Sequence, residues 1–376
     1  MLNIDYVISI NLDGNSGKEK ASREKAFFLK KKGKNVKIYS LHNKKNAILA
    51  CKLISMFFLE IRYLFLKLIN RNKPDIIFTR SFFEFGTYIV GKTFNIPVIR
   101  ELHADFQNEA KILFKNNPLM LFFSKIYGKY ELFFIKKSNG LIFNNERLEK
   151  YAHKMYGLQN IHTIAISNGC NTEQFYHIEK KYAREMLNLS KDQKYLLFIG
   201  SISKWHGVEF LLKMQEKIHN QNSEINLLLV GGANPDYLNY LKKNFQSKGV
   251  LYTGSVEYEK ALLYINAADI CLVSVNDIRI SPGSPIKLFD YISCGCPVIV
   301  QEKTEGYSDI VEKYNIGATT NFSDSEKASY DVQQFLGEAN FTYYLNNNRK
   351  VALESLNWNN IITQWLKFSE KLLVNE

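Results

Sequence analysis

The chain has 376 residues, which is long enough for two domains of ordinary size, each with its own buried core. Hydrophobic residues make up 46% of it, which excludes an intrinsically disordered protein as the default interpretation. The net charge of +12 arises in the first half, because residues 1–176 carry 28 Lys and Arg against 14 Asp and Glu, whereas the remaining residues carry 21 against 23. This asymmetry favours an anionic partner for the N-terminal half, although a solvated basic face would give the same balance.

Three kinds of anionic partner fit this charge: a membrane surface, a lipid-linked diphosphate acceptor and nucleic acid. Nucleic acid is the weakest of them, because the chain contains no recognised nucleic-acid-binding module. The five cysteines show no repeating pair spacing, which is typical of reduced thiols in a cytosolic protein. Met1 precedes a strand-like stretch and not a secretory signal, so we expect a cytoplasmic protein, located in part at the inner face of the cell membrane.

Short β-branched or aromatic runs alternate with helix-length segments twice along the chain, which predicts an α/β fold of two Rossmann-like, doubly wound domains. We place the N-terminal domain at residues 1–176, the C-terminal domain at 177–357 and a final helix, expected to pack back on the N-terminal domain, at 358–376. Ligands bind such sheets at the carboxyl ends of the strands, so the expected active site is a cleft lined by loops of both domains. The expected strands are Tyr6–Ile10, Val36–Tyr39, Asp75–Thr79, Pro97–Leu102, Gly140–Phe143, Tyr195–Ile199, Ile225–Val230, Val250–Tyr252, Asp269–Val275 and Pro297–Val300.

A polar loop follows the first expected strand and opens a helix, as an anion-binding loop does. We assign this loop to acceptor or phosphate contacts. It is not a Walker A loop, and the chain has no Gly-x-Gly-x-x-Gly fingerprint, which argues against a dinucleotide-dependent hydride transferase. The loop residues are Asp13, Gly14, Asn15, Ser16 and Gly17.

The segment Leu53–Ile69 is the most apolar in the chain, but three charged residues interrupt it, so it does not predict a membrane-spanning helix. Leu53–Ile69 and Leu119–Lys137 both mix large apolar residues with lysine, as interfacial helices do. Core helices that cover a sheet have a similar composition, and both interpretations stay open. The basic excess favours reversible contact with an anionic membrane surface.

The expected strand Pro97–Leu102 is followed by His103, whose side chain should point into the cleft. Glu101 and Asp105 are weaker candidates for the same rim. A single histidine is more often structural than functional, so position and context carry this assignment.

The most informative stretch is Ser281–Val300. A Ser/Gly/Pro loop there precedes a helix that should begin near Ile286, and the free N–H groups and positive dipole of a helix start favour a diphosphate. Lys287 adds a cation, and Asp290, one turn further on, can accept hydrogen bonds from the two hydroxyls of a ribose. An ordinary capped helix with a surface lysine is the alternative.

This stretch resembles the signature of the retaining glycosyltransferases of family 4, of the bacterial surface-polysaccharide type, whose two-domain fold is called GT-B. Ser284–Tyr291 matches a branch with the pattern Ser-Pro-x-Lys-x-x-Glu-Tyr, and Asp290 takes the place of the acidic residue that binds the donor ribose. The second Glu that is common in the family is replaced here by Pro282. The resemblance implies that His103, Lys287 and Asp290 are the catalytic residues.

Other segments resemble the same family in the expected order. Phe198–Gly207 looks like the loop after the first strand of the donor domain, with Ser201 and His206 where Arg and Lys are usual. Leu229–Ala233 and Tyr252–Val256 resemble the glycine turns after the next two strands. The resemblance implies a donor-binding set of Gly200, Ser201, Lys204, His206, Gly232, Gly254, Val256, Arg279, Ser284, Pro285, Ile286 and Leu288.

The expected enzyme is a hexosyltransferase that moves a sugar from a nucleoside-diphosphate sugar to a lipid-linked glycan with retention of configuration, in lipopolysaccharide, capsule or other surface-polysaccharide biosynthesis. No cofactor or metal ion is expected, because the helix dipole and nearby cations neutralise the diphosphate. Two alternatives stay open: a sugar-nucleotide epimerase of the same fold, and a non-catalytic binding subunit that has lost the usual Arg and Lys. Base, sugar, linkage and oligomeric state are not encoded in any recognisable pattern.

Overall fold

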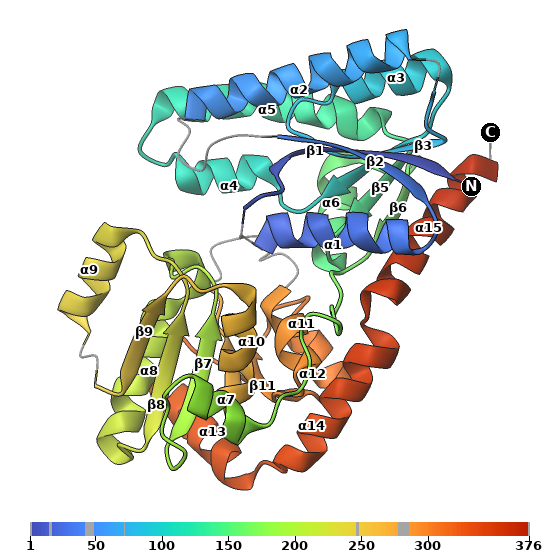
Figure 1. The fold of residues 1–376 in the computed structure, drawn as a ribbon. Helices are drawn as coiled ribbons and strands as arrows, with labels where there is room; N and C mark the ends of the chain where they lie inside the picture. Colours follow the sequence, from blue (N-terminus) through green and yellow to red (C-terminus); the bar gives the residue numbers. More distant parts are fainter. Residues whose placement is uncertain are drawn as a thin grey trace. The chain divides into compact units, whose positions relative to one another are not determined.

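The computed structural model describes residues 2–14, 17–41, 49–70, 72–245, 248–276 and 286–374. These residues form two compact units, one up to Asn168 and again from Trp358 onward, the other from Gly169 to Asn357. The first boundary lies a few residues before the predicted one at Tyr176. Each unit is an α/β layer structure with a parallel sheet (Figure 1).

The first unit contains, among its described residues, a parallel sheet in the order β2-β1-β3-β4-β5-β6. Its strands are β1 (Asn3–Asn11), β2 (Asn35–Leu41), β3 (Ile76–Arg80), β4 (Val98–Leu102), β5 (Gly140–Phe143) and β6 (His162–Ala165). Its helices are α1 (Gly17–Lys31), α2 (Leu49–Ile69), α3 (Phe85–Phe94), α4 (Phe106–Leu113), α5 (Pro118–Lys137), α6 (Glu146–Tyr156) and α15 (Trp358–Val374). The helices α2, α3 and α5 cover one face of the sheet, and α1 and α15 lie on the other (Figure 1).

The period-2 alternation of β1 explains this two-faced packing. Ile4, Tyr6 and Ile8 face α1 and α15, whereas Val7 packs against α2 and α3. The helix α15 contributes Trp358 and Trp365 to this core, and both indoles are almost fully buried. The last helix of the chain is therefore part of the unit built from its first residues.

The second unit has, within the described residues, a parallel sheet in the order β12-β11-β10-β7-β8-β9. Its strands are β7 (Lys194–Ile199), β8 (Ile225–Val230), β9 (Val250–Gly254), β10 (Ile270–Val273), β11 (Val298–Gln301) and β12 (Gly317–Thr320). Its helices are α7 (Lys180–Met186), α8 (Val208–Gln221), α9 (Pro235–Asn244), α10 (Tyr258–Ala267), α11 (Ile286–Ser293), α12 (Ser308–Tyr314), α13 (Ser325–Glu338) and α14 (Phe341–Lys350), with a 3-10 turn at Lys204–His206 and a π-helical turn at Val351–Ser355.

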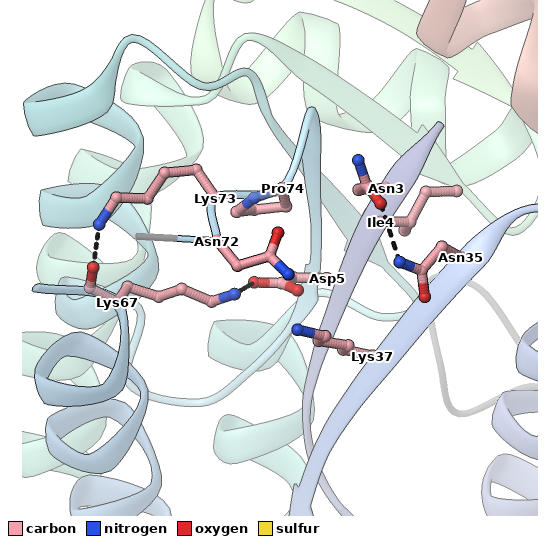
Figure 2. Close-up of a pocket in the computed structure, with 9 residues that line it drawn as sticks. All are labelled: Asn3, Ile4, Asp5, Asn35, Lys37, Lys67, Asn72, Lys73 and Pro74. Carbon is pink, nitrogen blue, oxygen red and sulfur yellow. Dashed lines mark hydrogen bonds and ion pairs between the residues drawn. The ribbon is translucent and has the colours of Figure 1, made fainter. Parts of the chain in front are cut away.

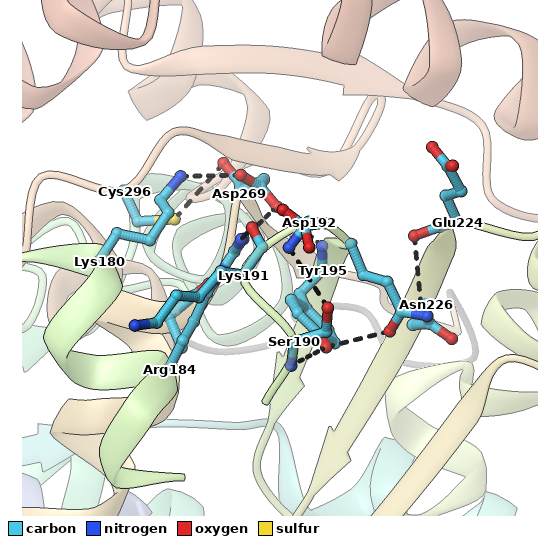
Figure 3. A network of polar contacts seen from close by, with 12 residues as sticks. Lys180, Arg184, Ser190, Lys191, Asp192, Tyr195, Glu224, Asn226, Asp269 and Cys296 are labelled. Carbon is cyan, nitrogen blue, oxygen red and sulfur yellow. Dashed lines mark hydrogen bonds and ion pairs between the residues drawn. The ribbon is translucent and has the colours of Figure 1, made fainter. Parts of the chain in front are cut away.

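A buried ion-pair network fastens α7 to the amino end of this sheet (Figure 3). The Asp269 carboxylate accepts from the Lys180 Nζ and the Arg184 Nη2, each at 2.8 Å, and from the backbone N–H of Tyr195 at 2.8 Å. The Arg184 guanidinium also donates to the carbonyls of Ala267 and Lys191. Because every charge here has an opposite charge or a carbonyl as partner, the network can be buried without leaving an uncompensated ion.

All ten predicted strands are present with ends shifted by at most a few residues, and β6 and β12 are additional. Both additional strands lie at sheet edges. Within the described part of the chain, no helix has the length and apolar character required to cross a membrane.

Candidate functional site

Three glycine turns lie side by side at the carboxyl edge of the second unit's sheet. The Gly200 N–H donates to the Val230 carbonyl at 2.9 Å, and the Gly231 N–H donates to the Gly254 carbonyl at 2.9 Å. The Ile202 N–H then donates to the Gly232 carbonyl at 2.8 Å. The ends of β7, β8 and β9 therefore form one continuous rim that contains the predicted Gly200, Gly232 and Gly254.

Glycine is required at two of these positions for steric reasons. The backbone of Gly231 has φ 146°, and a Cβ there would lie 1.9 Å from the Gly200 carbonyl oxygen. The backbone of Gly200 has φ 135°, and a Cβ there would lie 3.1 Å from the Lys287 Nζ. Main-chain atoms of the rim are thus held close to each other and to a lysine ammonium, with no side chain between them.

The described part of α11 covers Ile286–Ser293, which is the stretch predicted to be helical, and it includes Lys287. The Lys287 Nζ is buried 4.0 Å from the centroid of the Phe198 ring, and it has no hydrogen-bond partner among the described residues. Burial lowers the pKa of Lys287 to about 7. A buried ammonium beside a glycine rim, with no hydrogen-bond partner in the described part of the chain, is an arrangement suited to an anionic ligand.

The rest of α11 is anchored in the core of the second unit. The Tyr291 hydroxyl accepts from the Ile199 N–H at 2.9 Å, which ties the helix to the end of β7. Asp290 is 8% exposed and lies one turn after Lys287, as predicted. The Leu288 side chain is fully buried in the hydrophobic core, so its predicted donor contact could come only from its backbone. Gly295, at φ 83°, ends this helical segment.

The 3-10 turn after β7 carries the other predicted donor residues. The His206 ring nitrogen Nδ1 donates to the Ser201 carbonyl at 2.7 Å, which leaves Nε2 as the acceptor in neutral imidazole. The His206 ring also lies 5.8 Å from the Phe198 ring. Ser201 and Lys204 are exposed, and Val256, after β9, packs against the hydrophobic core.

His103 follows β4 at the carboxyl edge of the first unit's sheet. Its Nε2 lies 2.8 Å from the Glu101 Oε2, and the same carboxylate forms a buried ion pair with Lys25 of α1. Burial, together with the positive charges of Arg80 and Lys25, lowers the pKa of His103 to about 3. Burial opposes ionisation of Glu101, but Lys25 and His103 outweigh it and hold the pKa of Glu101 well below its usual range. Glu101 therefore accepts from His103 Nε2–H, and Nδ1 is left as an acceptor.

The Asp13–Gly17 loop is described in part, because Asn15 and Ser16 lie outside the described residues. The Arg23 guanidinium donates to the Gly14 carbonyl at 2.5 Å. A Cβ on Gly14 would lie 2.3 Å from the Glu19 carboxylate, so this carboxylate packs directly against the loop. The Glu19 carboxylate therefore lies near the start of α1, where an anionic ligand was predicted to bind.

Three predicted donor residues, Arg279, Ser284 and Pro285, lie outside the described residues. Of the others, Gly200, Ser201, His206, Gly232, Gly254 and Lys287 share the rim of the second unit, and His103 and the Asp13–Gly17 loop belong to the first unit. The part of the chain that is described contains no cluster of three or more His, Cys, Asp or Glu side chains suited to a metal ion.

A small hollow lies at the opposite, amino end of the first unit's sheet (Figure 2). Asp5 at its wall forms a buried ion pair with Lys67, and the Tyr63 hydroxyl donates to the same carboxylate at 3.0 Å. None of the residues predicted to bind the donor lines this hollow. The ion pair there joins β1 to α2 and is explained by packing.

Comparison with known proteins assigns a family to each unit. Residues 179–351 match the family model described as glycosyl transferases group 1, and residues 29–174 match the model described as glycosyltransferase family 4. The chain is a glycosyltransferase of the GT-B type. An uncharacterized glycosyltransferase of Methanocaldococcus jannaschii is 26% identical over 312 residues, covering 80% of this chain and 76% of the relative.

Solved structures confirm the GT-B fold. Sucrose-phosphate synthase from Thermosynechococcus elongatus superposes with a TM-score of 0.78 at 17% identity over 100% of both chains. The Anabaena protein HepE, solved in complex with UDP and glucose, superposes with a TM-score of 0.73 at 14% identity, over 99% of this chain and 100% of the other. The fold class predicted from sequence is therefore correct.

Two residues near the predicted site residues of this GT-B glycosyltransferase, Phe198 and Lys25, were not predicted from sequence. Phe198 was placed in a strand and at the start of the Phe198–Gly207 loop but was not named as a site residue, although its ring packs against Lys287. Lys25 was not singled out, yet it lies on the same stripe of α1 as Ala21, Phe28 and Leu29, which are all buried. A lysine at helical spacing among apolar residues is a signal that a buried carboxylate partner exists elsewhere in the chain.

Proposed function

We propose that this glycosyltransferase moves a hexose-type sugar from a nucleoside-diphosphate sugar to a lipid-linked glycan, with retention of anomeric configuration and without a metal ion. The proposed setting is the biosynthesis of a surface polysaccharide such as lipopolysaccharide or capsule, at the inner face of the cell membrane. The observation that carries the donor assignment is the buried Lys287 ammonium, which has no hydrogen-bond partner among the described residues and lies beside Gly200. The complexes of HepE with UDP and with UDP-glucose support a nucleotide-sugar donor.

In this proposal the diphosphate lies against the first turn of α11, where Lys287 neutralises charge that grows on the leaving group in the transition state. The N–H groups of that turn add the positive end of the helix dipole. Asp290 accepts from the donor ribose, and the glycine rim at Gly232 and Gly254 lets backbone groups approach the base. Binding UDP would also raise the pKa of Lys287, because a neighbouring anion favours the charged amine.

His103 is proposed to act on the sugar as a neutral residue. With Nε2–H committed to Glu101, its Nδ1 accepts a hydrogen bond from a sugar hydroxyl and does not deliver a proton. General-acid catalysis by His103 is disfavoured, because its pKa of about 3 keeps it unprotonated near neutral pH. His103 would thus orient the donor sugar for transfer.

The test is incubation of the purified protein with a panel of nucleotide sugars, with and without a membrane extract as acceptor source. Transfer to an extractable lipid, with the new linkage in the anomeric form of the donor by NMR, is the expected result. Formation of an epimeric nucleotide sugar without acceptor would favour an epimerase. Binding without turnover for every donor would favour a non-catalytic subunit.

A matched pair of variants tests the site itself. Lys287→Ala should strongly weaken UDP binding and steeply reduce transfer, whereas Lys213→Ala, at an exposed lysine on α8, should leave both unchanged. Normal activity of Lys287→Ala would place the donor site elsewhere.

A further inference from the structure

The outer face of the first unit's α2–α3–α5 layer is unusually apolar. Twelve of the 24 large hydrophobic side chains that are exposed among the described residues lie on α2 and α5, six on each helix. The most exposed aromatic residues include Phe58 at 60%, Phe65 at 59%, Phe122 at 58% and Phe123 at 54%. Such a concentration on two helices differs from the scattered single residues that are normal on a protein surface.

These side chains follow helical spacing on each helix. Ile54, Phe58, Phe65 and Ile69 form one stripe along α2, and Leu119, Phe122, Ile126 and Phe133 form another along α5. The stripes lie on the side of the helices that faces away from the sheet, because the opposite sides carry the buried residues.

Aromatic contacts and α3 join the two helices into one surface. The Phe57 ring of α2 lies 5.8 Å from the Phe83 ring, which lies 6.3 Å from the Tyr130 ring of α5. The helix α3 contacts both α2 and α5, and all three cover the same side of the sheet in Figure 1. We name the exposed residues of α2 and α5 the α2/α5 face.

The acidic residues of α2 and α5 and their exposed basic residues lie on different sides of the helices. The two carboxylates point inward: Glu60 is fully buried and accepts from the Thr87 N–H at 3.0 Å, and Glu131 pairs with the buried Arg100. The exposed charged residues are all basic, namely Arg62, Lys125, Lys129, Lys136 and Lys137. The α2/α5 face therefore presents apolar side chains and positive charge together.

We propose that the α2/α5 face docks on an anionic lipid bilayer, with α2 and α5 lying in the interface between headgroups and acyl chains. This mixture of large apolar and basic side chains is what an interfacial helix requires, and neither helix has the character of a membrane-spanning one. A second copy of the chain is a poorer occupant, since two such faces would bring like charges together. The α2/α5 face is thus the surface that would bring the proposed transferase to a lipid-linked acceptor. Only the acceptor in this statement rests on the proposed function.

The experiment is co-sedimentation of the full chain with vesicles of phosphatidylcholine, with and without phosphatidylglycerol. We expect binding to the phosphatidylglycerol vesicles that weakens between low and high salt, and little binding to phosphatidylcholine alone. The double variant Phe58→Ser/Phe122→Ser should reduce the partition coefficient about tenfold or more, because two exposed aromatic rings lose their burial in lipid.

The matched control is Tyr182→Ser/Tyr330→Ser, which removes two comparably exposed rings from the second unit and should bind vesicles like the original protein. Circular dichroism and UDP titration of both double variants show that the fold and donor site persist, so a failed vesicle assay is separable from a failed transferase assay. Equal binding to neutral and anionic vesicles, or an equal loss in the control variant, would overturn the proposal. So would a dimer in sedimentation velocity that Phe58→Ser/Phe122→Ser dissociates, because the face would then bind a second copy.

Discussion

The Lys287 Nζ lies 4.0 Å from the centroid of the Phe198 ring, with no hydrogen-bond partner among the residues that the structure describes. The ring face offers a weak electrostatic attraction, which does not replace the hydration that a lysine ammonium loses on burial. Among the described residues nothing offsets this loss, and burial lowers the pKa of Lys287 to about 7. An anionic ligand would relieve this cost, which links affinity at the site to its stability.

The substitution Lys287→Met should stabilise the unliganded protein while it weakens diphosphate binding. The pKa of Lys287 is about 7 in the folded protein, against an ordinary value of 10.5. Between these two pH values the unfolded chain holds one more proton than the folded chain. The free energy of unfolding of the unsubstituted protein therefore rises with pH in this range. Met removes the buried charge, so we expect the melting temperature at pH 7 to rise by roughly 2–4 °C. Affinity for UDP or GDP should fall about tenfold to hundredfold in isothermal titration.

A control for this substitution is Lys213→Met on the exposed side of α8, which should change neither quantity. A lower melting temperature in Lys287→Met with unchanged nucleotide affinity would mean that the lysine serves the fold and not the ligand.

Affinity for a nucleoside diphosphate should depend on pH in a predictable direction. In the unliganded protein Lys287 loses its proton as the pH rises through about 7, and the bound anion favours the protonated form. The dissociation constant for UDP should therefore increase from pH 6 to pH 9, and binding above pH 7 should be accompanied by proton uptake. Titrations in two buffers of different ionisation enthalpy measure this uptake. A flat profile in the original protein, or the same profile in Lys287→Met, would contradict the assignment.

His103 should remain neutral across the range in which an ordinary histidine titrates. Burial and the charges of Arg80 and Lys25 hold its pKa at about 3, so it stays unprotonated from pH 8 to pH 5. Long-range proton–nitrogen NMR should show Nε2 carrying the proton and Nδ1 as the bare nitrogen throughout. Assignment by a His103→Gln spectrum serves as the control. Protonation near pH 6.5 would show that burial and the charges of Arg80 and Lys25 do not keep this ring neutral.

Glycine at position 231 should be required for the rim of the second unit. Gly231→Ala forces a Cβ to within 1.9 Å of the Gly200 carbonyl at a φ of 146°, so we expect a loss of about 1–3 kcal/mol in unfolding free energy and weaker UDP binding. Gly337→Ala is the counterpart, because it lies within α13, where a Cβ meets no atom within 4 Å. Chemical denaturation should show Gly337→Ala unchanged or more stable by up to about 1 kcal/mol. Equal effects of the two substitutions would exclude the steric explanation.

Sequence patterns predicted the central strands well because these strands are buried on both faces and rich in apolar residues, as in Ile225–Val230, where Asn226 is the one polar residue. The strands β6 and β12 escaped prediction because His162–Ala165 and Gly317–Thr320 are short, largely half-buried and poor in large apolar residues. Their strand character depends on pairing with β5 and β11, which is a tertiary effect.

The site residues that could be predicted from sequence are those whose position depends on a local sequence pattern. A helix over Ile286–Ser293 that carries Lys287 was predicted from the proline and glycine residues on either side of a helical period. The Lys25–Glu101 ion pair joins residues far apart in the chain, and no local pattern indicates which carboxylate a buried lysine will meet. Leu288 was assigned to the donor-binding set by resemblance, although the helical spacing of Leu288 and Ile292 already indicated a buried side chain.

The helix α15 completes the hydrophobic core of the first unit with Trp358 and Trp365. During synthesis on the ribosome, the N-terminal unit can therefore not complete its core when only its own sheet has emerged. Its folding is completed after the second unit and Trp358–Val374 have also been synthesised. During that interval the surface of α1 and β3 that receives the two indoles stays open to water. Folding of the chain's first part is thereby coupled to translation of its last, and a premature stop within the final helix would damage the opposite end of the sequence.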